Sequence, residues 1–501
     1  MRYMIFKNLK QLILGAVVIT IVFASCNREV TVGRVLFKES KNKIYKDIDE
    51  AQLSETIGTV LEKEADKLKR AKFLKEFYQK NGNQAVLITK FFPDGKLDLL
   101  SERLANVSEH GLDPAHFNSN EFQELLQLIK SKDGISTLED AYQQIARLEL
   151  AAADALLNYS SALQFGVINP NKVLQRYYIE TKQADEGFME GILAAGNIET
   201  LLDSIQPKSD TYLALQNALK SGAKPENLSA EDAKKTIIVN MERARWKQEV
   251  DSNNMIYVNI PAFRLDVVKD RKVTDNMKVV VGTGRNNSGK TTFTDAKKIK
   301  DTPHSHETPV LESMIHSVQV NPYWNIPKSI AGKEILKLVQ ADRYYLSNAG
   351  IDVLQNEKIV EDPENIDWAS LSPDNLPYRF RQRPGDENSL GKIKFLFKNN
   401  SSVYLHDTPA QAAFDRDIRA ASHGCVRVEE PLDLAQALFD GDKFTTIKND
   451  MESAEQKPAR DVALSPKTQV VLDYKTVEVK DNKLQFYPDV YAQDIVLYSH
   501  M

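Results

Sequence analysis

The stretch Ser422-His423-Gly424-Cys425-Val426-Arg427 places a thiol between a histidine and an arginine. A thiol becomes a nucleophile when a nearby base or cation favours the thiolate, when N–H donors can stabilise an oxyanion, and when substrate has room to approach. His423 is a candidate base, Arg427 is a fixed positive charge, and Gly424 has no side chain to crowd the sulfur. A buried structural cysteine is the alternative interpretation, because cysteine packs as a small hydrophobe. The combination favours a catalytic Cys425.

A second extended segment, residues 402–406, adds another histidine. In a strand, residues two apart share a face. If the valine and leucine of this segment point into a core, Tyr404 and His406 both face away from it. By the same alternation, Cys425 and Arg427 lie together on the outer face of a strand. Two neighbouring strands of this kind would present all four side chains to one cleft, and the residues alone leave open which of the two histidines is the base.

The start of the chain is typical of an export signal. Basic residues precede an apolar run over residues 12–24, which is shorter than the roughly 20 residues that a spanning helix needs. Phe23-Ala24-Ser25-Cys26 also resembles the lipobox of bacterial lipoproteins. We therefore predict a lipoprotein signal peptide over residues 1–26 with lipidation at Cys26; an uncleaved anchor is the alternative. Both interpretations place the protein in the cell envelope, on the periplasmic side and anchored to a membrane.

The chain has two cysteines, so an acylated Cys26 leaves Cys425 unpaired. An unpaired cysteine in an oxidising compartment is either a free reactive thiol or part of an intermolecular disulfide. The length of 501 residues suggests two or three domains. A net charge of −5 argues against a nucleic-acid binder, which normally carries a basic excess.

Residues 27–50 are polar and lack periodicity, so we predict a tether there, with a candidate strand at residues 30–37. Residues 51–239 show helical periodicity and form the predicted helical domain. Its clearest helix begins at a capping box, Ser136-x-x-Glu139, keeps one apolar face as far as Leu163, and is stopped by Gly166.

From residue 240 to 501 the pattern changes to short strands, with a helix predicted at residues 430–439 and another from residue 408 to about 421. An aromatic, proline-punctuated insertion over residues 322–391 interrupts these strands. An insertion of this size is usually functional or disordered, and its aromatic content argues against disorder. We interpret it as a capping subdomain over the cleft. The cap residues that we expect to contact substrate are Tyr323, Trp324, Arg381 and Arg383.

Two further motifs in the chain lack the surroundings that a ligand site needs. Residues 284–291 match the phosphate-binding pattern G-x-x-x-x-G-K-[ST], but no helix is predicted after them, so we expect no nucleotide. His304 and His306 lack a third ligand near by, so we expect no metal site.

His406 and residues 422–427 together resemble the signature of L,D-transpeptidases, the cysteine enzymes that cross-link bacterial peptidoglycan. Other segments resemble the large, multi-domain type of this family in Gram-negative envelopes: Val258-Asn259-Ile260-Pro261-Ala262-Phe263, Asn321-Pro322-Tyr323-Trp324-Asn325-Ile326-Pro327, Arg381-Gln382-Arg383-Pro384-Gly385 and Tyr404-Leu405-His406-Asp407-Thr408-Pro409. His110-Gly111-Leu112-Asp113-Pro114 resembles the scaffold domain of that type. The resemblance implies an α+β fold, in which a helical scaffold domain precedes a mostly β catalytic domain with an inserted capping subdomain. This chain departs from the type in one respect, because residues 220–235 are too few for a separate peptidoglycan-binding module.

The resemblance also implies a reaction. Cys425 would attack a tetrapeptide stem, with His406 rather than His423 as the base, and an amine of a second stem would resolve the thioester into a 3-3 cross-link. Gly424, Cys425 and Tyr404 would supply the oxyanion hole, Ser422 and His423 would support the turn, and Arg427 would orient the loop or meet a carboxylate. No cofactor is implied, and carbapenems are expected to acylate the thiol.

Two alternatives remain open from the sequence. On the same fold, water could take the acyl group, which would give an L,D-carboxypeptidase or a hydrolase that releases wall-bound proteins. The chain could also be a non-catalytic lipoprotein that binds the wall.

Overall fold

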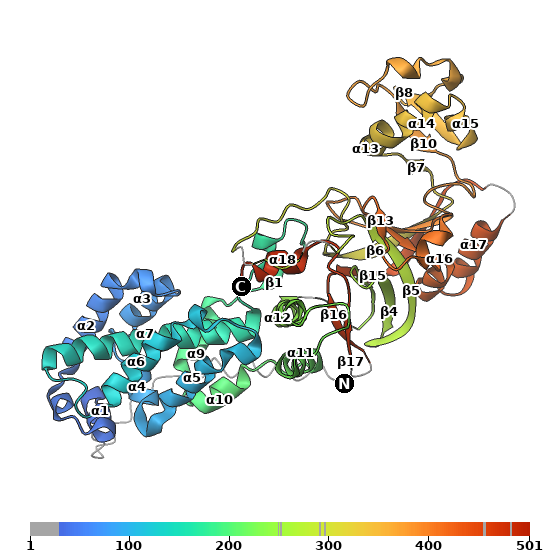
Figure 1. Cartoon of the computed structure of the whole chain (residues 1–501). Coiled ribbons are helices and arrows are strands. Elements are labelled where there is room, and N and C mark those ends of the chain that lie inside the picture. The colour runs from blue at the N-terminus through green and yellow to red at the C-terminus, as the bar shows by residue number, and fades with distance from the viewer. Residues whose placement is uncertain are drawn as a thin grey trace.

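The computed structural model describes residues 30–248, 250, 253–289, 292–294, 297–453, 457–480 and 483–501. The predicted leader and Cys26 lie outside these residues. Figure 1 shows a helical domain at one end in blue to teal, a β-rich domain in the middle, and a small lobe in yellow to orange that projects from the β-rich domain. The predicted α+β class and this order of domains are confirmed. Within the described residues, no helix is both long enough and apolar enough to cross a membrane.

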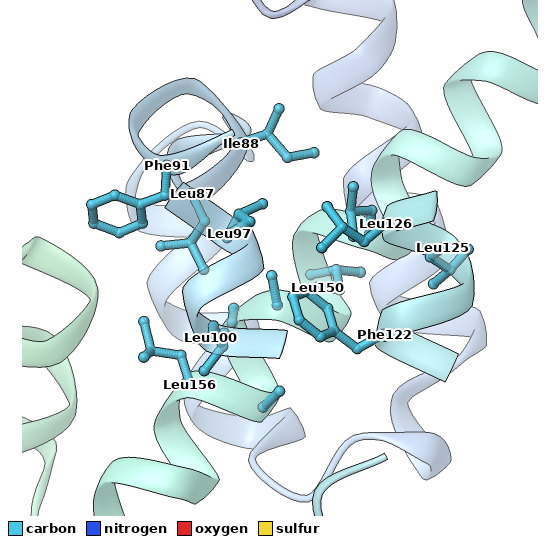
Figure 2. Close-up of a cluster of buried hydrophobic side chains, with 14 of the residues drawn as sticks. Leu87, Ile88, Phe91, Leu97, Leu100, Phe122, Leu125, Leu126, Leu150 and Leu156 are labelled. Atoms are coloured by element: carbon cyan, nitrogen blue, oxygen red, sulfur yellow. The ribbon is translucent and has the colours of Figure 1, made fainter. Parts of the chain in front are cut away.

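The helical domain is organised around one long central helix, α7 (Leu138–Phe165). Thr137, not the predicted Ser136, caps its first turn by accepting the Asp140 N–H, and the helix ends at Gly166 as predicted. Figure 2 shows how leucine and phenylalanine side chains of the neighbouring helices meet α7 in one buried cluster. The other helices here are α1 (Val32–Ser40), α2 (Glu50–Lys63), α3 (Ala71–Lys80), α4 (Val86–Phe91), α5 (Lys96–Ala105), α6 (Ser119–Lys130), α8 (Pro170–Val173), α9 (Glu186–Ala194) and α10 (Ile198–Ser204), with short 3-10 turns η1 (Lys43–Asp47), η2 (Ala65–Lys67), η3 (Pro93–Gly95), η4 (Val107–His110) and η5 (Pro114–Phe117).

The segment predicted as a tether belongs to this helical core. Val32 and Leu36 of α1 and Tyr45 of η1 are buried, and the Tyr45 hydroxyl donates to the Ile129 carbonyl at 3.0 Å. Thr31 caps α1. The apolar residues of α1 recur at three- and four-residue spacing, but the charged residues between them make this helical pattern hard to recognise in the sequence. The predicted tether is therefore wrong for residues 32–47, and the candidate strand at 30–37 is wrong because most of it is helix.

The β-rich domain is built on a nine-stranded sheet with the order β13-β5-β14-β12-β11-β6-β15-β3-β4, and β4 also pairs with β5, so the sheet curls back on itself. Its concave side encloses one apolar core. The strands are β3 (Met255–Asn259), β4 (Arg264–Lys269), β5 (Lys272–Gly282), β6 (Leu311–Val320), β11 (Ile393–Phe397), β12 (Leu405–His406), β13 (Ala420–Ser422), β14 (Val426–Val428) and β15 (Arg460–Asp473). The helices α16 (Pro431–Leu438), α17 (Gly441–Glu452) and α18 (Gln493–Tyr498) cover it.

The helix predicted from residue 408 to about 421 is wrong. The segment contains a short 3-10 turn, η9 (Gln411–Asp415), and then β13. β13 pairs in parallel with the end of β5, and the Val281 N–H donates to the Arg419 carbonyl at 2.8 Å. This sheet pairing outweighs the local helix signal and delivers the chain in extended form to Ser422.

The lobe over residues 324–382 matches the predicted position of the cap. A four-stranded sheet of order β7-β10-β8-β9 packs on short helices around Val353, Trp368 and Phe380. Its elements are β7 (Trp324–Asn325), α13 (Lys328–Ile330), the π-helical turn η6 (Ala331–Ile335), α14 (Leu336–Ala341), α15 (Tyr345–Asn348), β8 (Ile351–Gln355), β9 (Lys358–Ile359), the 3-10 turns η7 (Pro363–Asn365) and η8 (Trp368–Ser370), and β10 (Arg379–Gln382). The chain leaves for the lobe after β6 and returns into β11, and these two strands are hydrogen-bonded neighbours.

Two helices and two small β pairs join the helical and β-rich domains. The helices α11 (Asp210–Ser221) and α12 (Ala230–Arg245) share a small core with the hairpin of β16 (Val477–Lys480) and β17 (Lys483–Phe486). The pair β1 (Thr181–Lys182) and β2 (Lys247–Gln248) lies at the same junction.

Candidate active site

Two neighbouring strands carry the predicted nucleophile and base. β12 and β14 run in parallel, with His406 opposite Arg427, and the Val426 N–H donates to the Tyr404 carbonyl at 3.1 Å. Leu405 and Val426, which alternate along these strands with the site residues, are fully buried in the core under the sheet. The alternation therefore places Tyr404, His406, Cys425 and Arg427 together on the opposite face, as we predicted from the residues.

Cys425 is half-buried and is the free cysteine of the described residues. Burial raises the pKa of its thiol, whereas the Tyr404 backbone N–H and hydroxyl, which both interact with the sulfur, and the charge of Arg427 act against this rise. Because the net effect on the pKa is upward, the resting residue is a thiol at neutral pH. Its activation therefore requires a group that removes the proton.

His406 is the better placed of the two candidate bases. It is only 4% exposed, and burial lowers its pKa to about 3, so the imidazole is neutral at physiological pH. Its Nδ1 lies 2.5 Å from the Asp407 carbonyl oxygen. A carbonyl only accepts, so Nδ1 carries the proton and Nε2 is left free to accept one. The imidazole lies beside the Tyr404 ring, with centroids 5.7 Å apart, and that tyrosine contacts the sulfur.

His423 makes different contacts. It is exposed, its Nε2 lies 2.6 Å from a carboxylate oxygen of Glu334 in the cap, and its ring stacks edge-on against His306 at 4.6 Å between centroids. These contacts make His423 a bridge from the loop of Cys425 to the cap, which favours the supporting role that we predicted for it.

The turn before the thiol is held by hydrogen bonds on both sides. Gly424 has φ of +119°, a conformation that residues with a side chain rarely adopt. Its N–H donates to Ser422 Oγ at 3.1 Å, and Ser422 Oγ donates to the Cys425 carbonyl at 2.6 Å. The supporting role of Ser422 is therefore visible. The Gly424 N–H, however, is already bonded to Ser422 Oγ, so its predicted place in the oxyanion hole is wrong in this arrangement.

Arg427 is half-buried beside His406. Its Nε has no hydrogen-bond partner among the described residues, and burial lowers the pKa of its guanidinium. A desolvated guanidinium without a carboxylate partner is suited to bind an anionic group of a ligand.

This geometry agrees with two comparisons. Residues 253–446 match the model of the L,D-transpeptidase catalytic domain. The β-rich domain is thus similar to the catalytic domain of L,D-transpeptidases. Residues 72–219 match the model of the scaffold domain. A Haemophilus influenzae (strain ATCC 51907 / DSM 11121 / KW20 / Rd) protein named "Putative L,D-transpeptidase" is 29% identical over 321 residues, covering 63% of this chain and 60% of the relative. The match thus spans less than two thirds of the relative's length.

The four cap residues expected to contact substrate lie apart from the thiol of this transpeptidase-family domain. Arg381 pairs with Asp352 at 3.1 Å and stacks on the Tyr323 ring at 4.8 Å. Arg383 also pairs with Asp352, and Trp324 packs against the core of the cap. Among the described residues, the side-chain partners of these four lie within the cap. Within the described ranges, no hydrogen bond, ion pair or ring contact joins them to the candidate site, and their substrate role stays a prediction.

Three residues at the site were missed from the sequence. Thr308 donates its hydroxyl to the Gly424 carbonyl at 2.9 Å, and Glu334 reaches His423 from the cap. Both come from distant segments without a recognisable motif. Lys394 lies on β11 opposite His406. It could have been identified from the sequence, because alternation along the predicted strand at residues 392–397 places it on the outer face.

The phosphate-loop-like stretch is hydrogen-bonded to neighbouring segments of the β-rich domain. In the phosphate-loop-like stretch, Asn287 donates its side-chain amide to the Ala420 carbonyl at 2.6 Å, and Asn286 donates to the Asp489 carbonyl at 3.1 Å. The described residues that follow, 292–294 and 297–300, are not helical. No group of three or more potential metal ligands is found among the described residues.

Proposed function

We propose that this chain is an L,D-transpeptidase that forms 3-3 cross-links in peptidoglycan through a thioester on Cys425. The observation that carries the proposal is the thiol–Tyr404–His406 arrangement, with a neutral thiol and a neutral base, in a domain of this family. A neutral pair of this kind stays unreactive until substrate is aligned, which suits a nucleophile exposed to an oxidising compartment.

In the first half-reaction, the Cys425 sulfur attacks the carbonyl carbon that precedes the terminal residue of a tetrapeptide stem. His406 Nε2 takes the thiol proton and gives it to the leaving amine as the peptide bond breaks. The Cys425 N–H and the Tyr404 hydroxyl, which already contacts the sulfur, are the groups that we assign to the developing oxyanion.

In the second half-reaction, an amine of an acceptor stem attacks the thioester carbon. His406 removes a proton from this amine and returns it to the sulfur as the C–S bond breaks, so the thiol is restored and no cofactor is consumed. The strained carbonyl of a carbapenem would enter by the first step alone and leave Cys425 acylated.

We also propose that the protein is exported and anchored through a lipid on Cys26 at the periplasmic side of a membrane. The support is the basic, apolar and lipobox-like order of residues 1–26. Metabolic labelling with a fatty-acid analogue tests this. We expect label in the wild type and none in Cys26→Ala, and an unlabelled wild type would contradict it.

The enzymatic proposal is tested by mass spectrometry with disaccharide-tetrapeptide muropeptides. A Cys26→Ala background leaves one thiol in the chain, so any adduct is assigned to Cys425. We expect an acyl adduct, followed by cross-linked dimers, and neither product in Cys425→Ala. Tripeptide products without dimers would mean that water, and not an acceptor amine, resolves the thioester. The lack of any adduct would exclude the proposed enzyme.

A further inference from the structure

The outer face of the sheet carries one continuous row of polar side chains across five neighbouring strands. The registers pair Arg427 with His406, His406 with Lys394, Lys394 with Gln319, and Gln319 with Asp461. Neighbouring strands lie about 4.8 Å apart, so the row extends for roughly 20 Å from the strand of the nucleophile. The candidate base thus lies between two cations.

Of the two cations in this row, Arg427 has already been described as suited to an anionic group, whereas Lys394 has not yet been given a role. It is half-buried, its ammonium lies 5.6 Å from the centre of the Tyr404 ring, and its charge interacts with Cys425. In the described part of the chain, no carboxylate lies within ion-pair distance of it. Asp461, two strands away in the row, accepts a hydrogen bond from the Gln319 amide at 2.9 Å. A partly desolvated ammonium without a close counter-ion is a costly arrangement that a bound anion would relieve.

The position of Lys394 beneath the cap matters as much as its charge. β6 ends at Val320 just before the chain enters the cap, and β11 begins at Ile393 just after the chain returns. Lys394 is therefore at the foot of the cap, whereas the contact between Glu334 and His423 joins the cap to the loop of the thiol. A peptide lying between the cap and the sheet, with its acyl group at Cys425, comes within reach of Lys394.

The leaving group of the proposed reaction carries a charge that Lys394 could recognise. His406 must protonate the amine nitrogen of the leaving residue, and Lys394 is directly opposite His406. In a C-terminal amino acid the carboxylate carbon is two bonds from that nitrogen, whereas at an internal peptide bond the same position is an uncharged amide. An ammonium one strand away from the base can therefore distinguish a terminal residue from an internal one.

We propose that Lys394 binds the terminal carboxylate of the leaving residue and restricts acyl transfer to the end of the stem peptide. This inference rests on the proposed transpeptidase function, whose substrate specificity it explains. Binding also favours catalysis, because Lys394 and Arg427 both help to lower the pKa of His406, and a carboxylate on Lys394 offsets part of that effect when the imidazole takes the thiol proton.

A first experiment tests the anion site without any peptide. Iodoacetate and iodoacetamide alkylate thiols by the same displacement of iodide, but only iodoacetate carries a carboxylate. We measure the ratio of the two rates at Cys425 in the Cys26→Ala protein, in its Lys394→Gln variant, and in Lys398→Gln, an exposed lysine at the end of the same strand, as the control. We expect Lys394→Gln to lower the iodoacetate-to-iodoacetamide ratio about tenfold and Lys398→Gln to leave it within twofold. An unchanged ratio in Lys394→Gln overturns the proposal.

A second experiment uses tetrapeptide donors that end in a free carboxylate or in the matching primary amide. The wild type is expected to prefer the carboxylate at least tenfold in kcat/KM, Lys394→Gln to lose the preference, and Lys394→Arg to keep most of it. An equal fall for both donors in Lys394→Gln would mean a purely structural role and would overturn the proposal. Failure of the wild type to form a thioester with either donor would instead exclude the transpeptidase function, and the alkylation ratio would still decide on the anion site.

Discussion

His406 shows how burial of a single residue determines the kind of catalysis that this site can perform. A cysteine and histidine in a polar cleft can rest as a thiolate–imidazolium pair. Here burial raises the pKa of the Cys425 thiol and lowers that of the imidazole to about 3, so both groups rest uncharged. In the proposed mechanism the proton moves only when a substrate carbonyl is in place to take the negative charge, and general-base catalysis of this kind contributes a factor of about 10²–10⁴.

The same burial predicts a pH dependence of stability. The unfolded His406 takes up a proton near pH 6.5, but the folded residue does so only near pH 3, so the unfolded state binds more protons between these values. Above pH 6.5 the free energy of unfolding contains the full contribution of the neutral His406. As the pH falls below 6.5 this contribution is lost, and by pH 4.5 the free energy of unfolding has fallen by about 2–3 kcal/mol. Urea unfolding of the wild type and His406→Gln at pH 7.5 and pH 4.5 measures this. We expect a smaller loss in the variant, and equal losses would contradict a buried, neutral His406.

Tyr404 connects the base to the nucleophile, and its hydroxyl is the group to test. The Tyr404 side chain is half-buried, and its hydroxyl contacts the Cys425 sulfur. Tyr404→Phe keeps the ring but removes a donor to the thiolate and to the oxyanion, so the rate of thioester formation is expected to fall by a factor of about 10–1,000. The pH midpoint of iodoacetamide alkylation is expected to rise at the same time. Normal acylation with an unchanged midpoint would remove Tyr404 from the mechanism.

Among the structural elements, the turn of residues 422–425 depends on a segment more than a hundred residues earlier. Thr308 receives the Gly282 N–H at 2.8 Å and donates to the Gly424 carbonyl at 2.9 Å. A Cβ on Gly282 would lie 1.8 Å from the His306 carbonyl oxygen, so the two segments are in tight contact. The position of the thiol is therefore set by the end of β5 and the loop before β6 as well as by its own strand.

Thr308→Val tests this support with little change in shape. It leaves a buried N–H and a buried carbonyl without their partner, which costs about 1–3 kcal/mol each. We expect a lower thermal midpoint together with slower thioester formation, whereas Thr308→Ser, which keeps the hydroxyl, stays close to the wild type in both. Slower chemistry in the serine variant to the same extent as in the valine variant would show that the hydroxyl is not the cause.

The sequence alone predicts elements of this protein where a local pattern and the tertiary structure agree. Alternation along residues 402–406 and 425–428 placed four side chains on one face, and periodicity with a glycine stop placed α7. Alternation cannot say which strands are neighbours, so the polar row across β6, β11, β12 and β14 was not foreseen. The helix predicted from residue 408 was wrong because pairing with β5 overrides a local signal. Glu334 was missed because its contact depends on how the whole cap is placed over the loop.

At the scale of the whole molecule, a buried polar network ties the helical domain to the β-rich domain. Glu242 of α12 accepts the N–H groups of Val167 and Ile168, each at 2.8 Å, and pairs with Arg245 at 2.8 Å. Arg245 in turn donates to the His110 carbonyl in the helical domain at 2.9 Å. Arg243, the residue that follows Glu242 in α12, pairs with Asp494 of the C-terminal helix α18. The two domains are therefore linked through α12 by buried hydrogen bonds and ion pairs.

Glu242→Gln tests this junction. The side chains of Glu242 and Arg245 are fully buried, and breaking a buried ion pair from one side costs about 3–5 kcal/mol, because the remaining charge stays unpaired. This loss of stability is located at the junction between the domains, far along the chain from Cys425. We therefore expect the contacts between the two domains to weaken while the thiol keeps its reactivity. The expected result is faster proteolysis around residues 246–253 and a larger radius of gyration in solution scattering, with an unchanged rate of iodoacetamide alkylation. Glu231→Gln, an exposed residue of the same helix, is the matched control and is expected to resemble the wild type in all three. If Glu242→Gln matched this control in proteolysis and scattering, the network would not be what fixes the two domains, and a loss of alkylation would mean that the junction also shapes the site.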